Sequence, residues 1–439
     1  MHEYASLYQQ LYAEKKGTLA DCLSLIRSGD VVFTTNNYSE PTVILSHLHE
    51  IAPRVENVRV WKGRSGIYPF MTDPDMRGHI EMYNYFFGPT FYNVSQKLGL
   101  VEYVPSDLQS YFTVAVSGHP ANVCIAAVTP MDENGVFHLG LNFAAEGLGV
   151  QDAIDHHKTI ILEVNPNLHT MAGAQEIRIE DVTMLLEVDS PEYVIPPIVP
   201  TELEDRIGAL AAGLVRDGDT IQLGIGGIPN AVGSYLMEKH DLGIHSEMFT
   251  TSMMHLIQAG VITGEKKSFD RGLHVCAFAE GVPELYPFLQ NNPNCRIRSG
   301  HLVVDPFEIA RQDNMVSINT LVEIDLTGQV CAESVGPRQI SGSGGAFCFA
   351  YGAYRSKGGR SILAFPARTG KGQSKIRATL TPGAVVTTPR NYADYIVTEF
   401  GVAHLKGATI RERAERLIAI AHPDDRAELT AQARALQFL

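Results

Sequence analysis

The sequence predicts an α/β protein made of two similar open-sheet α/β domains. Short apolar runs typical of buried strands alternate with segments of helical spacing, and one strand-like run ends in a glycine-rich turn. A short motif from the N-terminal half also recurs near the middle of the chain. With 439 residues the chain is too long for one ordinary hydrophobic core, so two sizeable domains are expected.

The first half of the chain alternates expected helices with expected strands. Residues 5–27 place leucines at helical spacing and end at Ser28-Gly29, and a further helix is expected to open at Pro41. Apolar and β-branched runs predict the intervening strands at residues 30–34, 58–61, 112–116, 123–128 and 159–164.

A weak internal repeat marks the two domains. Leu25 to Phe33 aligns with Leu214 to Gln222 through identical Leu, Arg, Gly and Asp residues, and a proline-initiated helix follows each copy. With so few identities, chance is an alternative explanation of the match. The proline-rich segment from Pro191 to Pro200 separates the copies, so the predicted domains are residues 1–195 and 196–439.

The second copy leads into the stretch on which the functional prediction depends. An expected strand, residues 220–223, runs into the turn 224–227, where missing glycine side chains let backbone N–H groups approach a ligand closely. A helix is expected from Pro229 to about His240, and a short strand then ends at Glu247. Such a βαβ unit brings the glycine amides and the Glu247 carboxylate to one edge of a parallel sheet, where ligands of open α/β sheets bind.

The spacing of the glycines excludes two common nucleotide sites. The G-x-G-x-x-G fingerprint requires a third glycine where this chain has Pro229, and no G-x-x-x-x-G-K-[ST] loop occurs in the sequence. A nicotinamide cofactor is therefore not expected. Taken alone, the loop also fits a tight turn that needs glycine for its geometry only.

The segment GIGGIPNAV, followed by LGIHSEM, resembles the acetyl-CoA hydrolase/transferase family, and within it the 4-hydroxybutyrate and butyrate CoA-transferases, which have the duplicated fold of family I CoA-transferases. The resemblance covers most of the second half of the chain. In that family the Glu of H-S-E-M is the nucleophile that carries CoA as a glutamyl thioester, and the G-I-G-x-I loop contacts CoA. The resemblance therefore implies a catalytic Glu247 in the C-terminal domain, with CoA contacts at Gly224, Ile225, Gly226, Gly227 and Ile228.

A second glycine cluster, Ser341 to Gly345, matches another CoA-contacting element of the family, with Gly345 and Val322 as the corresponding positions. The chain departs from the family pattern directly afterwards. Relatives usually continue with Gln or Ser and then Asp-Phe, whereas this chain reads Ala346-Phe347-Cys348-Phe349. A carboxylate usually close to the site is missing, which bears on the acyl substrate more than on the type of reaction.

Other charged residues of the second half have competing interpretations. The alternation of apolar residues from 322 to 326 puts Glu323 and Asp325 on the polar side of a strand, which we favour over a catalytic role. Three cations are candidates for CoA phosphates, but each also fits an ordinary surface or structural cation: Lys375, Arg377 and Arg390.

Composition limits the classes of partner. A net charge of −14 argues against nucleic acid, whose phosphates need basic patches, whereas a phosphorylated cofactor needs only a few amides and cations. No apolar run is long enough for a membrane span, and the N-terminus shows no export signal. The six cysteines lack a metal-type spacing, and His156-His157 fits a solvated helix end, so reduced thiols, no metal and a cytoplasmic location are expected.

Together these features predict a CoA-transferase that moves CoA from an acyl-CoA to a small carboxylic acid through a glutamyl-CoA thioester. Candidate acids are 4-hydroxybutyrate, butyrate, acetate, succinate and itaconate. Coenzyme A, as acyl-CoA, is the expected cofactor, and the resemblance implies a homodimer or higher oligomer. Two alternatives stay open: an acyl-CoA hydrolase with the same site, and a non-catalytic acyl-CoA-binding protein. Glu247 also fits a purely structural role before the next helix, where an acid contributes roughly 0.3–1 kcal/mol.

Overall fold

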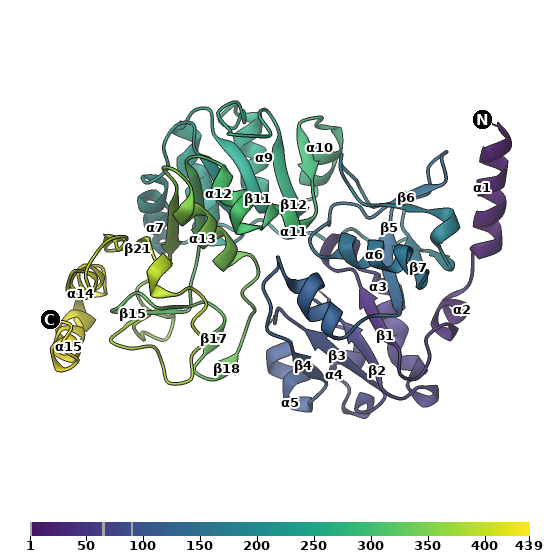
Figure 1. Cartoon of the computed structure of the whole chain (residues 1–439), viewed down its shortest axis with the longest axis horizontal. Helices are drawn as coiled ribbons and strands as arrows, with labels where there is room; N and C mark the ends of the chain where they lie inside the picture. Colours follow the sequence, from purple (N-terminus) through teal and green to yellow (C-terminus); the bar gives the residue numbers. More distant parts are fainter. Residues whose placement is uncertain (1, 64–65, 89–90) are drawn as a thin grey trace. The chain divides into compact units, whose positions relative to one another are not determined.

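The computed structural model describes residues 2–63, 66–88 and 91–439 (Figure 1). The chain folds into two compact units, Met1–Ile195 with Ala277–His301, and Pro196–Cys276 with Leu302–Leu439. Each unit contains an open sheet with helices, so the predicted class of two similar α/β sheets is confirmed. No helix in the described part of the chain is both long and apolar enough to cross a bilayer.

The division of the chain differs from the predicted bounds in one segment. The break after Ile195 lies in the proline-rich stretch, which has no regular secondary structure from residue 188 to 201. Ala277–His301, placed in the C-terminal domain by the sequence, belongs to the first unit instead. The Phe143 N–H donates to the Ala277 carbonyl over 2.8 Å, and the Gly300 N–H donates to the Phe143 carbonyl over 2.8 Å. The position of the proline-rich linker alone does not indicate that a later segment of the chain returns to the first unit.

The sheet of the first unit has seven parallel strands in the order β4-β3-β2-β1-β5-β7-β9. The chain runs outward from β1 to β4 and then restarts beside β1 with β5, so the switch point lies between β1 and β5. The strands are β1 (Val31–Thr34), β2 (Val58–Trp61), β3 (Ile80–Asn84), β4 (Val101–Tyr103), β5 (Val123–Val128), β7 (Thr159–Val164) and β9 (Met184–Glu187); β6 (Val136–His138) and β8 (Glu176–Arg178) form a separate antiparallel pair.

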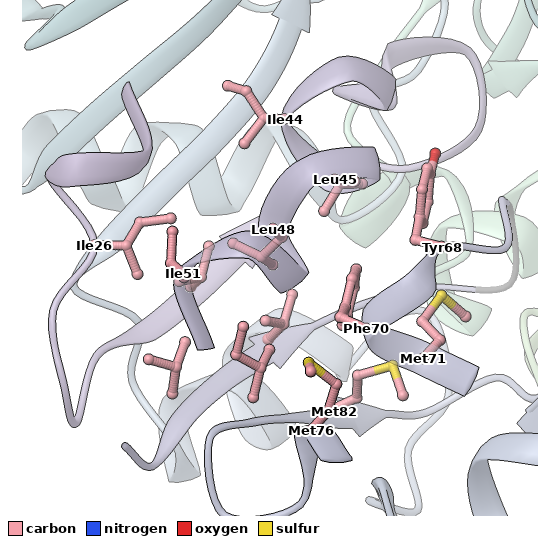
Figure 2. Close-up of a cluster of buried hydrophobic side chains, with 14 of the residues drawn as sticks. Ile26, Ile44, Leu45, Leu48, Ile51, Tyr68, Phe70, Met71, Met76 and Met82 are labelled. Atoms are coloured by element: carbon pink, nitrogen blue, oxygen red, sulfur yellow. The ribbon is translucent and has the colours of Figure 1, made fainter. Parts of the chain in front are cut away.

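Helices cover this sheet through a cluster of buried apolar side chains (Figure 2). Ile44 and Leu45 come from one helix and Phe70 and Met71 from another, and all four are fully buried. The helical segments are α1 (His2–Lys15), α2 (Leu19–Ser24), η1 (Asn37–Ser39), α3 (Thr42–His47), η2 (Leu48–Arg54), α4 (Pro69–Thr72), η3 (Pro74–Met76), η4 (Phe91–Ser95), α5 (Gln96–Leu98), η5 (Tyr111–Val116), α6 (Glu146–Asp155), η6 (Ile179–Asp181) and α10 (Leu285–Asn291).

The strand predicted at residues 112–116 is wrong, because this stretch forms the π-helical turn η5. Its buried residues, Tyr111, Ala115 and Val116, follow a helical spacing rather than an alternation. The Asp107 carboxylate accepts the N–H of Ser110 over 2.8 Å, and the carbonyl of Ser110 accepts the N–H of Val114 over 2.8 Å. These local bonds outweigh the β propensity of the sequence.

The second, eight-stranded sheet has the order β13-β12-β11-β10-β14-β19-β21-β22. Strand β10 pairs in parallel with β11 and β14, so the switch point lies between β10 and β14, and β22 pairs antiparallel with β21. The strands are β10 (Thr220–Leu223), β11 (Gly243–Phe249), β12 (His274–Ala279), β13 (Cys295–Ile297), β14 (Met315–Asn319), β19 (Arg360–Ala364), β21 (Tyr395–Thr398) and β22 (Gly401–His404).

The remaining elements of the second half pack around this sheet or form short additions to it. The helical segments are α7 (Glu202–Ala212), α8 (Gly227–Tyr235), η7 (Leu236–Glu238), α9 (Thr251–Gln258), α11 (Gly300–Val303), α12 (Pro306–Arg311), α13 (Ala346–Arg355), η8 (Arg390–Tyr392), α14 (Ile410–Ala419) and α15 (Pro423–Ala435). The short strands are β15 (Glu323–Asp325), β16 (Val330–Cys331), β17 (Ser334–Val335), β18 (Arg338–Gln339) and β20 (Ile376–Arg377).

The weak sequence repeat has a structural counterpart. Strands β1 and β10 both border the switch point of their sheet, and the same turn precedes each strand. Gly29 and Gly218 adopt φ values of +81° and +78°, which favour glycine. The Asp30 carboxylate accepts the N–H of Arg27 over 2.7 Å, and that of Asp219 accepts the N–H of Arg216 over 2.6 Å. The identical Gly and Asp of the repeat therefore build one turn twice.

Candidate active site

The glycine-rich turn lies at the carboxyl end of β10, beside the switch point of the second sheet. Gly226 precedes α8 as its N-cap with φ +131° and ψ −179°, a conformation that L side chains rarely adopt. The helix begins at Gly227, two residues before the predicted start, and ends at Tyr235, before the predicted end. No side chain caps the first turn of α8, and the Glu204 carboxylate lies against Gly227, where an added Cβ would be 2.3 Å from its carboxyl carbon.

The carboxyl end of the neighbouring strand β14 leads to Thr320, Leu321 and Val322 beside this turn. The side-chain amides of Gln222 and Asn319 exchange two hydrogen bonds of 3.1 Å each, and this pair joins the ends of the two strands. Neither residue was predicted as part of the site, because no spacing in a single sequence links two amides on separate strands.

Glu247 lies on β11, the other neighbour of β10, two residues before the strand ends. Thr220 and Ile221 pair in register with Gly243 and Ile244, so continuing three residues along both strands places Gly224 alongside Glu247. The predicted βαβ unit is therefore present. The carboxylate of Glu247 is partly exposed in a strand whose preceding residues are buried.

The second glycine cluster reaches the Glu247 carboxylate. A Cβ added to Gly345 would collide with Oε2 of Glu247 and lie 3.1 Å from its carboxyl carbon. It would also lie 3.3 Å from Cγ1 of Val304, so Gly345 fills a narrow space beside the acid. The φ of Gly345 is −91°, which any residue adopts, so lack of space, and not backbone conformation, requires glycine here.

Residues before Glu247 fix the end of β11. The ring of His245 is 3% exposed, and its Nε2 donates to the carbonyl of Val303 over 2.8 Å. The ring also meets that of Phe269 edge to face at 6.0 Å. Ser246 is fully buried. The H-S of the H-S-E-M motif therefore anchors the strand, while Glu247 reaches the edge.

Val322 lies where the chain leaves β14 for β15, and its N–H donates to the carbonyl of Cys331 over 2.8 Å. The preceding carbonyl, that of Leu321, accepts a 2.8 Å hydrogen bond from Nζ of Lys375. Burial lowers the pKa of Lys375 to about 8, and Nζ also lies 5.2 Å from the centre of the Phe365 ring. Lys375 thus supports the loop that carries Val322, as a structural cation.

The other charged candidates have structural partners. Nε of Arg377 donates to Glu323 over 3.0 Å, whereas the side chain of Arg390 is exposed. Glu323 also accepts the N–H of Thr381 over 2.7 Å, and Asp325 accepts the N–H groups of Thr327 and Gln329 over 2.9 and 3.0 Å. Glu323 and Asp325 are 5% and 1% exposed, so the predicted polar strand face is wrong: both acids are buried and organise turns.

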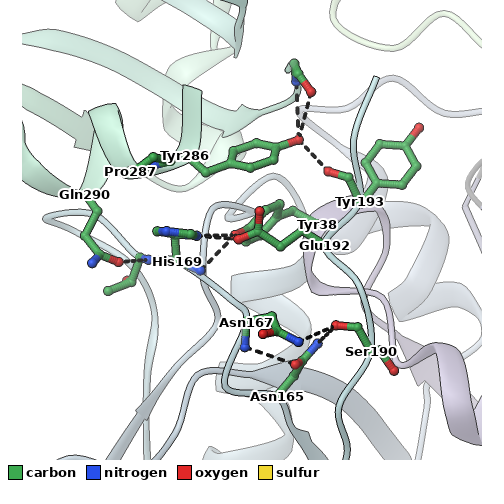
Figure 3. Close-up of polar contacts among 12 residues, drawn as sticks. Tyr38, Asn165, Asn167, His169, Ser190, Glu192, Tyr193, Tyr286, Pro287 and Gln290 are labelled. Atoms are coloured by element: carbon green, nitrogen blue, oxygen red, sulfur yellow. Dashed lines mark hydrogen bonds and ion pairs between the residues drawn. The ribbon is translucent and has the colours of Figure 1, made fainter. Parts of the chain in front are cut away.

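The first unit contains a separate cavity of about 230 Å³ near the ends of β1, β5 and β7. Figure 3 shows part of its wall, where the Tyr38 hydroxyl donates to Glu192 over 2.8 Å and Nδ1 of His169 contacts the same carboxylate. In the second unit a more open groove of about 760 Å³ runs between residues 372–382 and α15. Neither lining includes Glu247.

The candidate metal ligands form no metal site in the described ranges, and the cysteines are buried. Within residues 2–63, 66–88 and 91–439 there is no group of three or more His, Cys, Asp or Glu side chains suited to a metal ion. His156 and His157 are exposed at the end of α6. All six cysteines are buried thiols, and burial raises the pKa of Cys22 to about 11 and those of Cys124 and Cys295 to about 12.

Comparisons with known proteins identify relatives of the chain. A family model described as acetyl-CoA hydrolase/transferase C-terminal domain matches residues 281–433. The succinyl-CoA:cyclohexane-1-carboxylate CoA transferase of Geobacter metallireducens is 37% identical over 432 residues, 98% of this chain and 97% of that protein. The 4-hydroxybutyrate coenzyme A transferase of Clostridium kluyveri is 44% identical over 311 residues, 71% of this chain and 72% of that protein.

Solved structures and more distant relatives extend the comparison. The crystal structure of RipA from Yersinia pestis aligns with a TM-score of 0.90 and 34% identity, over 98% of this chain and all of that chain. The acetyl-CoA hydrolase of Yarrowia lipolytica is more distant, with 25% identity over 375 residues, 75% of this chain and 68% of that protein.

Proposed function

The chain belongs to the acetyl-CoA hydrolase/transferase family and is a CoA-transferase, and from this premise we propose that Glu247 is its nucleophile. One observation supports the proposal most. The Glu247 carboxylate lies at the carboxyl edge of the second sheet, beside the glycine turn after β10 and within van der Waals reach of Gly345. Three sequence-predicted elements therefore meet at the edge where open α/β sheets bind ligands.

The proposed reaction conserves the thioester energy at each step. An oxygen of Glu247 attacks the acyl-CoA carbonyl, the C–S bond breaks, and a mixed anhydride and CoA thiolate result. The thiolate then attacks the glutamyl carbonyl of the anhydride. The donor acid leaves as a carboxylate, and glutamyl-CoA remains. An acceptor carboxylate runs the same two steps in reverse, so no proton is consumed and ping-pong kinetics are expected.

Each addition step creates an oxyanion that needs hydrogen-bond donors. Backbone N–H groups of residues 224–228 or 342–345 are the proposed donors, because both segments are rich in glycine, which allows close approach. Losing one such donor typically costs on the order of 100- to 1000-fold in rate. Acyl-CoA and a carboxylate supply all reacting groups, so the proposed chemistry requires neither a metal nor a nicotinamide.

The proposed acceptors are small carboxylic acids of the kinds in the names of the relatives, together with itaconate. A panel of acetate, butyrate, 4-hydroxybutyrate, succinate, itaconate and cyclohexane-1-carboxylate, each assayed with acetyl-CoA and succinyl-CoA, would identify the pair. We expect parallel lines in double-reciprocal plots for the preferred pair. Transfer to none of these acids would overturn the substrate class.

The covalent step has a direct test. Incubating the protein with acyl-CoA without an acceptor and then reducing with borohydride should inactivate it and change the mass of the peptide that carries Glu247. The Glu247→Gln variant keeps the shape but loses the anionic nucleophile, so transfer should fall to background while the fold survives. Glu333→Gln is the control acid of the same unit. A Glu247→Gln variant with near wild-type turnover, or label on Glu323 or Glu333, would refute the assignment.

Two alternatives lead to different outcomes in the same assays. A hydrolase releases CoA from acyl-CoA in water without an added carboxylate, and its rate is independent of the acceptor. A non-catalytic acyl-CoA-binding protein binds the ester but gives neither transfer nor a borohydride-trapped adduct. The lower identity to the acetyl-CoA hydrolase than to the transferases supports transfer.

We further propose that the protein works as a cytoplasmic homodimer or higher oligomer. The six buried cysteine thiols support a reducing compartment, and the family resemblance supports the oligomer. Sedimentation should give about twice the chain mass of 48.1 kDa or more, and a mass near that of one chain would count against it. Cell fractionation tests the location.

A further inference from the structure

The departure from the family pattern after Gly345 puts an aromatic side chain at the start of α13. Cys348 and Phe349 face the interior, with 2% and 1% exposure, whereas Phe347 is half-buried on another side of the helix. Tyr351, four residues further along, stacks on Phe347 with ring centres 5.9 Å apart and an interplanar angle of 13°. Phe347, which lies where the chain departs from the family pattern, therefore begins a partly exposed row of aromatic side chains on α13.

Tyr392 of η8 extends this row into a cluster of four rings. Its ring lies 6.1 Å from that of Phe347, 4.6 Å from that of Tyr351 and 5.7 Å from that of Tyr354. All four rings are half-buried, so each is packed on its neighbours and open to solvent in part. We call Phe347, Tyr351, Tyr354 and Tyr392 the aromatic face.

Exposed cations border the aromatic face. The guanidinium of Arg355 lies 5.6 Å from the centre of the Tyr351 ring, and Nζ of Lys406 lies 3.9 Å from that of Tyr354. Arg390 is exposed at the start of η8. Asp394 is 1% exposed, and its carboxylate interacts with Lys406 at longer range. Nε2 of His404 lies 3.1 Å from this carboxylate, which also accepts the N–H of Ser361 over 3.1 Å. The surface is thus locally positive on a chain of net charge −14.

We propose that the aromatic face binds the adenine nucleotide end of CoA, an inference that rests on the proposed attack by Glu247. Helix α13 begins at Gly345, which touches the Glu247 carboxylate, and its ten residues extend about 15 Å away from it. A thioester carbonyl at Glu247 puts the pantetheine arm at the start of the helix. The nucleotide lies beyond that arm.

The chemistry of the face matches the nucleotide. Adenine stacks on tyrosine and phenylalanine rings, and the loss of one such stack by alanine substitution weakens binding measurably. Arginine and lysine bind phosphate oxygens through charge-assisted hydrogen bonds. A protein partner or a second copy of the chain is the competing occupant of an aromatic surface, and the experiment below separates it.

The test compares acyl-CoA with the matching acyl-pantetheine, which has the same thioester but no nucleotide. In Tyr351→Ala, Tyr392→Ala and Arg355→Met, kcat/KM for acyl-CoA should fall about 5- to 100-fold, while kcat/KM for acyl-pantetheine stays at the wild-type value. The matched control is Phe400→Ala, which removes another exposed ring of the second unit that lies 5.8 Å from a guanidinium, that of Arg426. Phe400→Ala should leave kcat/KM unchanged for both acyl-CoA and acyl-pantetheine.

Equal losses on both substrates would overturn the proposal and mean that the rings support Glu247 or the fold. Unchanged kinetics in all three variants would also overturn it. A change of sedimentation mass in Tyr351→Ala or Tyr392→Ala, with equal losses on both substrates, would assign the face to a second copy of the chain.

A binding measurement separates this inference from the proposed function. Adenosine 3′,5′-bisphosphate, titrated against tyrosine fluorescence, should bind the wild type and bind Tyr351→Ala at least about 5-fold more weakly. If no acid accepts CoA but this difference is found, the nucleotide site stands and the proposed reaction fails. If transfer proceeds and the difference is absent, the reaction stands and the nucleotide site fails.

Discussion

The carboxyl ends of the central strands differ between the two sheets, although the sheets share a topology. Val31 of β1 pairs with Arg59 of β2, and the repeat-equivalent Thr220 of β10 pairs with Gly243 of β11. Counting four residues onward along the second strand of each pair reaches Gly63 in the first unit and Glu247 in the second. The position of the proposed nucleophile is therefore a glycine in the first copy.

The two sheets differ in which strand end carries the large side chain and which carries glycine. In the first unit a Cβ on Gly63 would lie 2.7 Å from Oδ1 of Asn36, and this oxygen accepts the Gly63 N–H over 2.7 Å. In the second unit the loop after β10 is the glycine-rich one, and the strand end holds the acid. A duplicated fold thus offers the same edge twice. The loop after β1 places Asn36 against the position equivalent to Glu247, whereas the loop after β10 leaves room for the acid at that position.

The strand ends of the first unit beside Gly63 contain a buried charge network. Lys62 is fully buried and forms an ion pair with Glu40, which is 6% exposed, and its Nζ lies 3.4 Å from Oδ1 of Asn36. Nδ2 of Asn36 donates to Glu146 over 3.0 Å. Burial lowers the pKa of Lys62, and the neighbouring Glu40 opposes this shift. The network joins Lys62 and Glu40 to Asn36 and Glu146 at this edge.

The largest expected effect is on this network. Lys62→Met leaves the Glu40 carboxylate buried without its cation, so the free energy of unfolding should fall by about 3–5 kcal/mol in urea denaturation. Adding Glu40→Gln removes the orphaned charge, and the double variant should recover most of the loss. A single variant that loses less than about 1 kcal/mol would show that the pair is solvated.

The next effect tests the strand end that carries Glu247. Gly345→Ala brings a Cβ into the position of Oε2 of Glu247, and since a misplacement of about 1 Å can cost about 100-fold, transfer should slow by roughly that factor. Gly370→Ala is the matched control, because its added Cβ meets nothing within 4 Å. Steady-state kcat/KM of both variants measures the difference. Equal activities would mean that Glu247 need not occupy its present position.

Features set by local requirements were predictable from the sequence, whereas contacts between residues far apart in the sequence were not. The repeat, the glycine turn and the strand carrying Glu247 were predictable, because they depend on local requirements such as the positive φ of Gly218 and Gly226. The proximity of Gly345 to Glu247 followed only from the family resemblance, since no local pattern shows it. Glu323 and Asp325 were misplaced on a polar face because hydrogen bonds from distant or turn residues, such as Thr381, let acids be buried.

A pair of substitutions in the glycine turn separates two needs for glycine. Gly226→Ala forces alanine to φ near +131°, which costs about 1–3 kcal/mol of unfolding free energy. An added Cβ at Gly224 meets nothing within 4 Å, so Gly224→Ala should fold like the wild type. If acyl-CoA approaches this backbone, however, its KM should rise several-fold. An unchanged KM in Gly224→Ala would move the ligand away from the turn.

The smallest effect concerns Glu163, a second buried acid at the strand ends of the first unit. Glu163 belongs to β7, is 1% exposed and accepts the N–H groups of Val43 and Ile44 at the start of α3. Burial raises the pKa of Glu163 to about 7, and these two hydrogen bonds oppose the shift. The acid also lines the cavity of about 230 Å³.

The raised pKa gives a definite sign for the pH dependence. Between the unfolded pKa of about 4.3 and the folded pKa of about 7, the folded protein keeps a proton that the unfolded chain has lost. The contribution of Glu163 to stability therefore falls as pH rises through this window, by at most about 1.4 kcal/mol per pH unit. Glu163→Gln is neutral throughout, so its unfolding free energy relative to wild type should increase from pH 5 to about pH 7 and then level off. Parallel curves for the two proteins in urea titrations at each pH would show that the first unit holds this acid ionised, and would contradict the expected pH dependence.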